Sequence, residues 1–203
     1  MSIAYTRFVS PAPSRTSVEA IVDAARRILE ADGLSEVTMR RVAEQVGVQG
    51  PSLYKRVPDR AALVRAVADG VVTDLAQTLE RATGTGDAGS DLRSVAHAYR
   101  DFVRRNPNGY RLLFADLPAG ASPDPTALAA LGDPIVRAMS GVTGDRVALE
   151  GARTVVAWAH GFVTMELAGA FRLGGDLDAA YAFGIDSIVA GVRSRATRAS
   201  RSG

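Results

Sequence analysis

One stretch of this 203-residue chain, TMRRVAEQVGVQGPSLYKRV from Thr38 to Val57, limits the possible folds more than any other. Thr38 can N-cap a short helix, and Gly47 stands where a turn would need a positive φ before a second short helix. Apolar residues recur at helical spacing on the side that would face a core. The side that would face solvent carries donors and cations, namely Gln49, Ser52, Tyr54, Lys55 and Arg56. This pattern predicts a helix-turn-helix, a unit that can place a helix in the major groove of DNA.

The segment alone leaves a second interpretation open, because many helical hairpins with a glycine turn serve only to pack. Charge between Thr38 and Arg60 favours contact with nucleic acid, since five cations and two acids lie there. They are Arg40, Arg41, Lys55, Arg56 and Arg60, with Glu44 and Asp59. A stripe of this size can neutralise phosphates, whereas the net charge of +2 predicts no general affinity for polyanions.

The flanking residues predict two more helices. Arg15–Gly33 carries an apolar stripe at helical spacing, and Thr16 and Glu19 have the spacing of a capping box at its start. After the second short helix, Asp59 can N-cap a longer helix that reaches about Ala82. Residues 15–60 are therefore expected to form a three-helix unit joined to a connecting helix.

With these elements in place, the chain resembles the TetR family of bacterial transcriptional regulators. The spacing agrees over about fifty residues, and the matching residues are Ile28-Leu29, Gly33, Thr38, Val42-Ala43, Val46-Gly47-Val48, Leu53-Tyr54 and Leu63. Val57 departs from the aromatic that is usual in the family, and Arg60 stands in place of a lysine. Gly50-Pro51 replaces a Lys-Gly or Arg-Gly-like pair; a first-turn proline is compatible with a helix but removes one donor for a phosphate.

The resemblance and the outward-facing pattern together imply a set of DNA contacts. Phosphate contacts are expected from Thr38, Tyr54, Lys55 and Arg60, base-edge contacts from Gln49, Gly50, Pro51 and Ser52, and a further contact from Arg40. In a dimer the two second helices would enter successive major grooves about 34–36 Å apart, so the operator is expected to be palindromic.

The rest of the chain predicts an all-α protein. Helices are expected at residues 91–105, 110–115, 126–140, 146–171 and 177–195, with a connector at 83–90 and breaks at 106–109 and 141–144. The predicted organisation is a flexible arm at 1–14, a helix-turn-helix domain at 15–60, a helical regulatory and dimerisation domain at 61–197, and a basic tail at 198–203. Arg7 and Arg15 could reach DNA from the arm, although a disordered end is the simpler interpretation.

The helix expected over Ala148–Ala170 is apolar nearly all round, which predicts that it is covered on both sides. A four-helix interface formed by the last two helices of each subunit would provide the second cover. The alternative is a central core helix in a monomer; the family resemblance implies the dimer.

The segment Trp158-Ala-His160-Gly161-Phe162 resembles a TetR-like subgroup with a Trp-His-Gly C-terminal domain, which implies a regulatory domain without naming a ligand. An aromatic-lined ligand pocket is expected from Tyr99, Phe102, Tyr110, Phe114, Trp158, His160, Phe162 and Met165. The alternative is that these aromatic residues are ordinary core and that His160 is a hydrogen-bonded structural histidine.

Enzymatic function is not expected, because the sequence has no Gly-rich phosphate loop, nucleophile elbow or metal-binding cluster, and no cofactor is predicted. The chain lacks cysteine and has two histidines, which excludes disulfides and histidine-rich metal sites. No signal peptide or membrane span is predicted, so a cytoplasmic protein without a membrane partner is expected. The sequence thus favours a dimeric DNA-binding regulator, a repressor released by a small, largely apolar ligand; a regulator without such an effector is the alternative, and an activator is not excluded.

Overall fold

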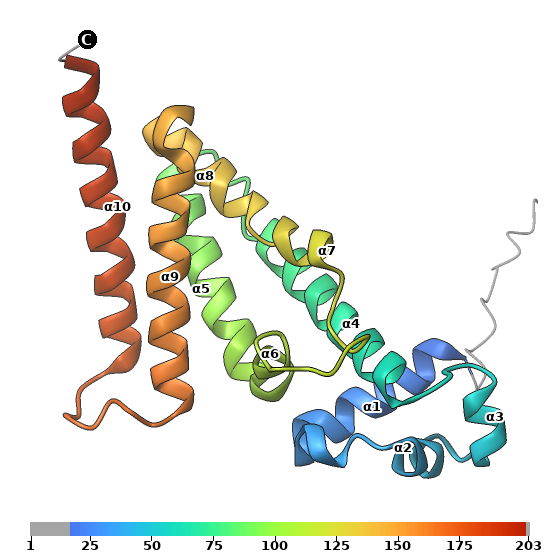
Figure 1. Ribbon diagram of the computed structural model, residues 1–203. Coiled ribbons are helices and arrows are strands. Elements are labelled where there is room, and N and C mark those ends of the chain that lie inside the picture. Colours follow the sequence, from blue (N-terminus) through green and yellow to red (C-terminus); the bar gives the residue numbers. More distant parts are fainter. Residues whose placement is uncertain (1–16, 202–203) are drawn as a thin grey trace, which may run out of the picture.

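The computed structural model describes residues 17–201, and within them every regular element is a helix (Figure 1). The α-helices are α1 (Val18–Asp32), α2 (Met39–Val46), α3 (Gly50–Tyr54), α4 (Arg60–Arg81), α5 (Ala88–Arg105), α6 (Pro107–Leu112), α7 (Pro125–Ala130), α8 (Asp133–Thr143), α9 (Ala148–Leu167) and α10 (Leu177–Arg201). Two 3₁₀ turns lie at Leu34–Glu36 and Asp145–Val147. The predicted all-α fold, with an N-terminal helix-turn-helix domain and a C-terminal helical domain, is confirmed. The predicted arm, residues 1–14, lies outside the described residues.

Short-range signals in the sequence set the N-terminal helices. The Thr38 side chain accepts a hydrogen bond from the Arg41 amide at 3.2 Å, as its predicted role as N-cap of α2 requires. Gly47 ends α2 in the left-handed region with φ 73°, and Asp59 caps α4 by accepting from the Ala62 amide at 2.8 Å. The predicted start of α1 was one residue early, since its N-cap is Ser17, whose hydroxyl accepts from the Ala20 amide.

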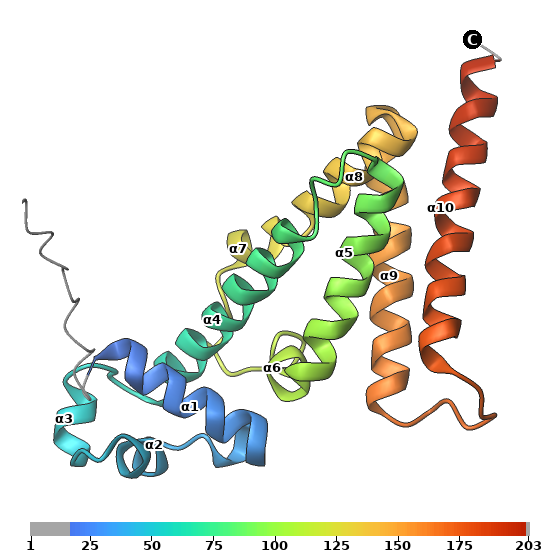
Figure 2. The same ribbon diagram turned by 180° about the vertical axis from the view of Figure 1, so that it is seen from behind.

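A shared core holds the three small helices against the start of α4. Leu53 and Val57 are buried and tie α3 and its following turn to α1 and α2, as the sequence predicted. Leu63 on α4 is fully buried in the same cluster, so the connecting helix belongs to both parts of the molecule. Figures 1 and 2 show α4 running from the small N-terminal domain into the larger helical domain.

Several boundaries in the C-terminal domain differ from the prediction. Asp87 caps α5 by accepting from the Ser90 amide, so this helix begins inside the expected connector. The expected break at 106–109 is instead the first turn of α6, because Pro107 suits the N1 position of a helix. The single helix expected over 126–140 is divided into α7 and α8, and α10 extends to Arg201.

The helices of the C-terminal domain form layers. α5, α8 and α9 pack against one another, and α10 lies along α9 and α5 at the edge of the molecule farthest from α3 (Figures 1 and 2). Short α6 lies against both α1 and α4, at the junction of the two domains. Among residues 17–201, none of the helices combines the length and apolar character needed to span a bilayer.

Candidate nucleic-acid interface and internal cavity

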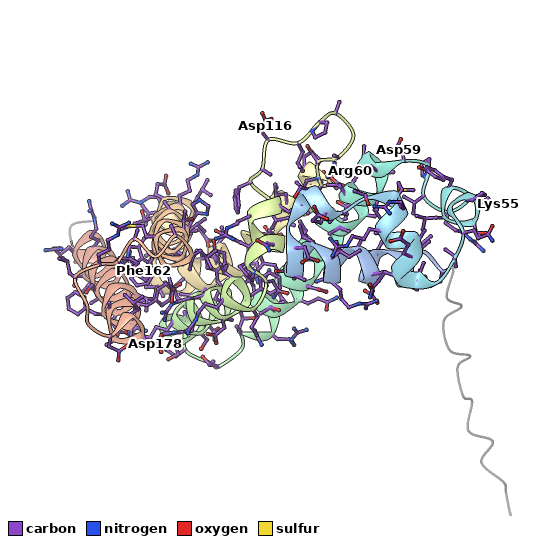
Figure 3. The ribbon with its side chains drawn as sticks, turned by 90° about the horizontal axis from the view of Figure 1, so that it is seen from below. Lys55, Asp59, Arg60, Asp116, Phe162 and Asp178 are labelled. Atoms are coloured by element: carbon purple, nitrogen blue, oxygen red, sulfur yellow. The ribbon has the colours of Figure 1, made fainter. Side chains whose placement is uncertain are left out.

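The surface around α3 has the geometry of an open recognition surface. Leu53 anchors the helix in the core, whereas Gln49, Ser52, Tyr54 and Lys55 are exposed. Tyr54 is 54% exposed, an unusual position for an aromatic ring that has no partner to cover it. Within the described part of the chain, these four side chains make no hydrogen bond or ion pair, so their polar groups are available to a ligand. Figure 3 places Lys55 at the opposite end of the molecule from Phe162 and Asp178.

The other predicted DNA contacts are partly engaged within the chain. Arg60 donates from Nε to the Val37 carbonyl and from a terminal nitrogen to the Leu34 carbonyl, each at 2.8 Å. Its guanidinium therefore fixes the start of α4 to the turn before α2, and only its remaining N–H groups could reach a phosphate. Arg40 is exposed and pairs with Glu44 at 3.3 Å, an exposed pair of the kind that contributes little stability and opens readily.

Three more of the predicted contacts have backbone roles or lack a polar side chain. The Thr38 hydroxyl caps α2, while Gly50 and exposed Pro51 form the first turn of α3. Arg56, which the sequence placed on the outer side but not among the DNA contacts, is exposed beside Lys55. Its addition gives this end of the domain two adjacent cations.

The larger domain contains a cavity of about 330 Å³, and it is open on part of its surface, since Phe114, Ala129 and Val156 of its lining are exposed. The lining comes from α4 (Leu75, Leu79), α5 (Val95, Ala96, Tyr99), α6 and the residues after it (Tyr110, Leu113, Phe114), α7, α8 and the turn between them (Leu128, Ala129, Leu131, Gly132, Ile135) and α9 (Val155, Val156, Ala159, His160). The lining holds no aspartate, glutamate, lysine or arginine. An apolar chamber with a few polar groups is typical of small-molecule sites.

Three polar side chains of the lining form one hydrogen-bonded cluster. The Tyr110 hydroxyl bonds to the Tyr99 hydroxyl and to Nδ1 of His160, the second at 2.5 Å. Burial, followed by the hydrogen bond to Tyr110, raises the pKa of Tyr99 above its ordinary value, and burial also raises the pKa of Tyr110. Both phenols are therefore neutral near pH 7. Phe114 adds ring contacts to Tyr110 and His160, with centroids 5.1 and 4.6 Å apart.

The structure divides the predicted pocket residues into two groups. Tyr99, Tyr110, Phe114 and His160 line the cavity, whereas Phe102, Trp158, Phe162 and Met165 do not. The reason is helical phase on α9: Ala159 and His160 face the cavity, while Trp158 and Phe162 pack on the Tyr181 ring of α10, with centroids 4.8 and 5.0 Å away. Met165 is exposed, and Phe102 is buried in the core.

A buried charge network, which the sequence did not predict, fastens α5, α9 and α10 together. Arg100 is 4% exposed and makes two 2.8 Å hydrogen bonds to the Glu166 carboxylate and a 2.8 Å ion pair with Asp178. These bonds, that to Glu166 first, raise the pKa of the guanidinium, which also lies over the rings of Phe162 and Tyr181. The Tyr181 hydroxyl donates to the Ala96 carbonyl at 2.8 Å.

A second unpredicted contact joins the cavity wall to the N-terminal domain. Glu30 of α1 accepts hydrogen bonds from the backbone amides of Gly109 and Asn108, at 2.7 and 3.1 Å, in the first turn of α6. The Asn108 side chain donates in return to the Leu29 and Glu30 carbonyls. Tyr110 follows directly, so the same short helix carries the centre of the cavity cluster and the contact with α1.

The outer faces of α9 and α10 carry exposed apolar side chains. Met165 on α9 and Phe183 on α10 are exposed by 46 and 75%. The predicted inner stripe of α10 is buried at Tyr181 and Ile185. The helix pair is therefore covered on one side only within this chain.

Comparison with known proteins identifies the family. The family model described as bacterial regulatory proteins, tetR family, matches residues 21–67, and that described as tetracyclin repressor-like, C-terminal domain, matches residues 92–188. The chain is 33% identical over 191 residues to an uncharacterized HTH-type transcriptional regulator of Mycobacterium tuberculosis, with 91% of this chain and 85% of that protein covered. The chain belongs to the TetR family of bacterial regulatory proteins. It is accordingly a DNA-binding transcriptional regulator and not an enzyme.

Solved structures share the TetR architecture. A protein of unknown function from Rhodococcus sp. RHA1 gives a TM-score of 0.75 at 24% identity, with 92% of this chain and 98% of that chain covered. A TetR variant from Acinetobacter baumannii AYE, in complex with minocycline, gives 0.61 at 25% identity, with coverage of 85% and 94%. Members of the family bind DNA operators, usually as dimers, and respond to small molecules.

Proposed function

We propose that this protein is a homodimeric repressor that leaves a palindromic operator when a small, largely apolar ligand enters its cavity. The observation that carries the proposal is the pairing of an exposed, unpartnered α3 surface with an apolar cavity in one chain. The domain limits expected from the sequence, 15–60 and 61–197, divide the chain between these two features, with the basic tail at 198–203 beyond them.

In the proposed complex, α3 and its preceding turn enter the major groove. Gln49 and Ser52 meet base edges because they are exposed on either side of Pro51 at the start of α3. Tyr54 and Lys55 meet phosphates, with Thr38, Arg40 and Arg60 beside them, and Gly50 allows close approach of the backbone. Phosphate contacts would carry most of the affinity, so binding should weaken as salt is raised.

The second subunit is proposed to dock on the exposed face of α9 and α10. Met165 and Phe183 would then lie in a four-helix interface, away from solvent. A C2 dimer requires a surface that fits its own copy, and a pair of long, nearly parallel helices meets that condition. The two α3 helices would lie at the far end of the dimer, free to meet successive grooves of DNA.

Ligand release is proposed to follow from a shift in population. A ligand that binds the conformation without DNA more tightly than the DNA-bound conformation would reduce operator affinity. The reduction at saturation equals the ratio of the two ligand affinities. Shifts of α4, and of α6 through its contact with α1, would change the spacing of the two α3 helices. The structural neighbour in complex with minocycline supports the assignment of this domain to a small effector.

Two finer assignments belong to the same proposal. The Trp158-Ala-His160-Gly161 sequence supports placement in the Trp-His-Gly subgroup, although the matching C-terminal family model is described only as tetracyclin repressor-like. A regulator of this kind acts where bacterial DNA is, so we propose that it works in the cytoplasm.

The test is selection of bound sequences from random duplex DNA with the purified protein at near-physiological salt. The proposal predicts enrichment of a palindrome, which Gln49→Ala should alter in sequence preference and Lys55→Ala should weaken for all sequences alike. Enrichment of a non-palindromic site would contradict the dimeric mode. An unchanged preference in Gln49→Ala would remove that residue from the base contacts.

The second candidate is a DNA-binding regulator controlled by a protein partner or by its own concentration, without a small ligand. The apolar cavity favours the first candidate, because a regulator without a ligand has no need of an apolar recess in its helical domain. Operator affinity that no cavity-binding compound alters would favour the second.

A further inference from the structure

The polar groups of the cavity are gathered on one wall. Tyr110 lies at the centre of the cluster, and its hydroxyl joins that of Tyr99 on α5 to the ring of His160 on α9. The remaining lining side chains are aliphatic apart from Phe114. A bound molecule would therefore meet hydrogen-bonding groups at one end and hydrocarbon everywhere else.

The lining also disfavours a charged ligand. A buried carboxylate or ammonium needs an opposite charge or several hydrogen bonds to offset its desolvation. The lining offers no aspartate, glutamate, lysine or arginine, and Nδ1 of its one histidine, His160, is already bonded to Tyr110. Burial raises the pKa of both Tyr99 and Tyr110, so neither phenol supplies a negative charge near neutral pH. A neutral ligand meets no such penalty.

The cluster can match either a donor or an acceptor on the ligand. A phenol has one rotatable O–H and two acceptor positions, so the direction of donation along Tyr99, Tyr110 and His160 can reverse. Among residues 17–201, the Tyr99 hydroxyl bonds only to Tyr110, which leaves hydrogen-bonding capacity at this end of the cluster. A single hydroxyl or carbonyl group on the ligand would use that capacity.

We propose that the effector is an uncharged, compact, largely apolar molecule with one hydroxyl or carbonyl group at one end, and that Tyr99, Tyr110 and His160 determine this specificity. The inference rests on the proposed regulation by a small ligand and names the chemical class of that ligand. A cavity of about 330 Å³ lies near the lower end of the range for small-molecule sites, which suits two or three fused rings.

The experiment titrates the full-length protein calorimetrically with three probes of the same shape: 2-naphthol, naphthalene and 2-naphthoate. The expected result is that 2-naphthol binds about tenfold more tightly than naphthalene and at least tenfold more tightly than 2-naphthoate. In Tyr99→Phe, 2-naphthol should bind within about threefold of naphthalene, because the hydroxyl with unused hydrogen-bonding capacity is gone.

Two control variants separate specificity from stability. Tyr181 is not among the lining residues. Tyr181→Phe removes its buried hydroxyl, which bonds to the Ala96 carbonyl, and the variant should retain the preference for 2-naphthol. Ala129→Trp adds bulk at an exposed position of the lining, and it should weaken binding of all three probes without a change in the buried core.

The ligand class is wrong if 2-naphthoate binds as tightly as 2-naphthol, if no probe binds, or if Tyr99→Phe keeps the hydroxyl preference. Operator affinity measured in parallel tests the proposed function separately. Selective binding of 2-naphthol without any change in operator affinity would support the ligand class and contradict release by ligand. If the probe series fails but another compound lowers operator affinity, the ligand class is contradicted and release by a ligand is supported.

Discussion

The contact between Glu30 and α6 predicts a specific coupling defect. In the structure the carboxylate accepts two backbone hydrogen bonds at the start of α6, and Gly109 permits this approach because a Cβ there would lie 2.8 Å from Oε1. Glu30→Ala removes both bonds and leaves the Asn108 side chain, which donates to the Leu29 and Glu30 carbonyls, as the remaining hydrogen-bonded link between α6 and α1. We expect the substitution to weaken communication between the cavity and the DNA-binding domain while both remain folded.

The size of the effect follows from the bonds that are lost. A hydrogen bond to a charged group contributes about 1.5–3 kcal/mol, and an anion at a helix start about 0.3–1 kcal/mol at an exposed site. Because Glu30 is half-buried and water can replace it at the two amides, the lower end applies to each bond, and about 3 kcal/mol of stability should be lost. For a chain of this length, that lowers Tm by roughly 6–12 °C.

The assay compares operator affinity with and without saturating 2-naphthol. We expect at least a fivefold ratio in the wild type, within the usual range of coupling between two sites, and less than twofold in Glu30→Ala. Glu80→Ala is the matched control, since Glu80 also bonds between helices but through an exposed ion pair with Arg137. A folded Glu30→Ala protein that keeps the wild-type ratio would refute the coupling role.

Three further predictions follow from the packing and the charges. Burial raises the pKa of Tyr99 and Tyr110, so the stability that the two phenols contribute is complete below about pH 10, the pKa of the unfolded state, and falls as pH rises above it. The free energy of unfolding in urea, measured from pH 8 to 11, should show that fall, and a flat profile would contradict the prediction. Phe183→Arg should make the protein monomeric by sedimentation with little change in helix content, whereas a retained dimer would place the interface elsewhere. Gly184→Ala would bring a Cβ within 2.2 Å of Trp158, so about 1–3 kcal/mol of stability should be lost in urea unfolding, and an unaffected protein would show that the α9–α10 contact adjusts freely.

Sequence reasoning was reliable where the signal and its partner lie within one turn of chain. Thr38 caps an amide three residues ahead, and Gly47 adopts its conformation without help from distant residues. The same short-range rules predicted Asp59 as the N-cap of α4 and Leu53 as a buried residue of α3. Most of the fold follows from such local rules, because helix ends and apolar faces are encoded at short range.

Only part of the cavity lining could be predicted, because the sequence of a helix that is apolar on all sides does not indicate which side faces the cavity. On α9 the sequence offered Trp158, Phe162 and Met165 as pocket residues, but which face meets α10 is decided by Tyr181 and Arg100 across the bundle. Contacts between distant segments were likewise invisible. Arg60 bonds to carbonyls 23 and 26 residues away, and Glu30 to amides 78 and 79 residues away.

The distribution of strong contacts indicates which wall of the cavity can move. On one side, Arg100 clamps α5 to α9 through Glu166, and breaking such a buried pair costs about 3–5 kcal/mol, while its ion pair with the exposed Asp178 of α10 adds less. On the other side lies α6, with six residues, held to α1 chiefly by Glu30 and the Asn108 side chain. A ligand that displaces Tyr110 therefore meets less resistance from α6 than from the clamped helices. A shift of α6 would then move α1, which it contacts. The face of α9 and α10 proposed for the second subunit would stay in place, so the DNA-binding domain would move relative to that face.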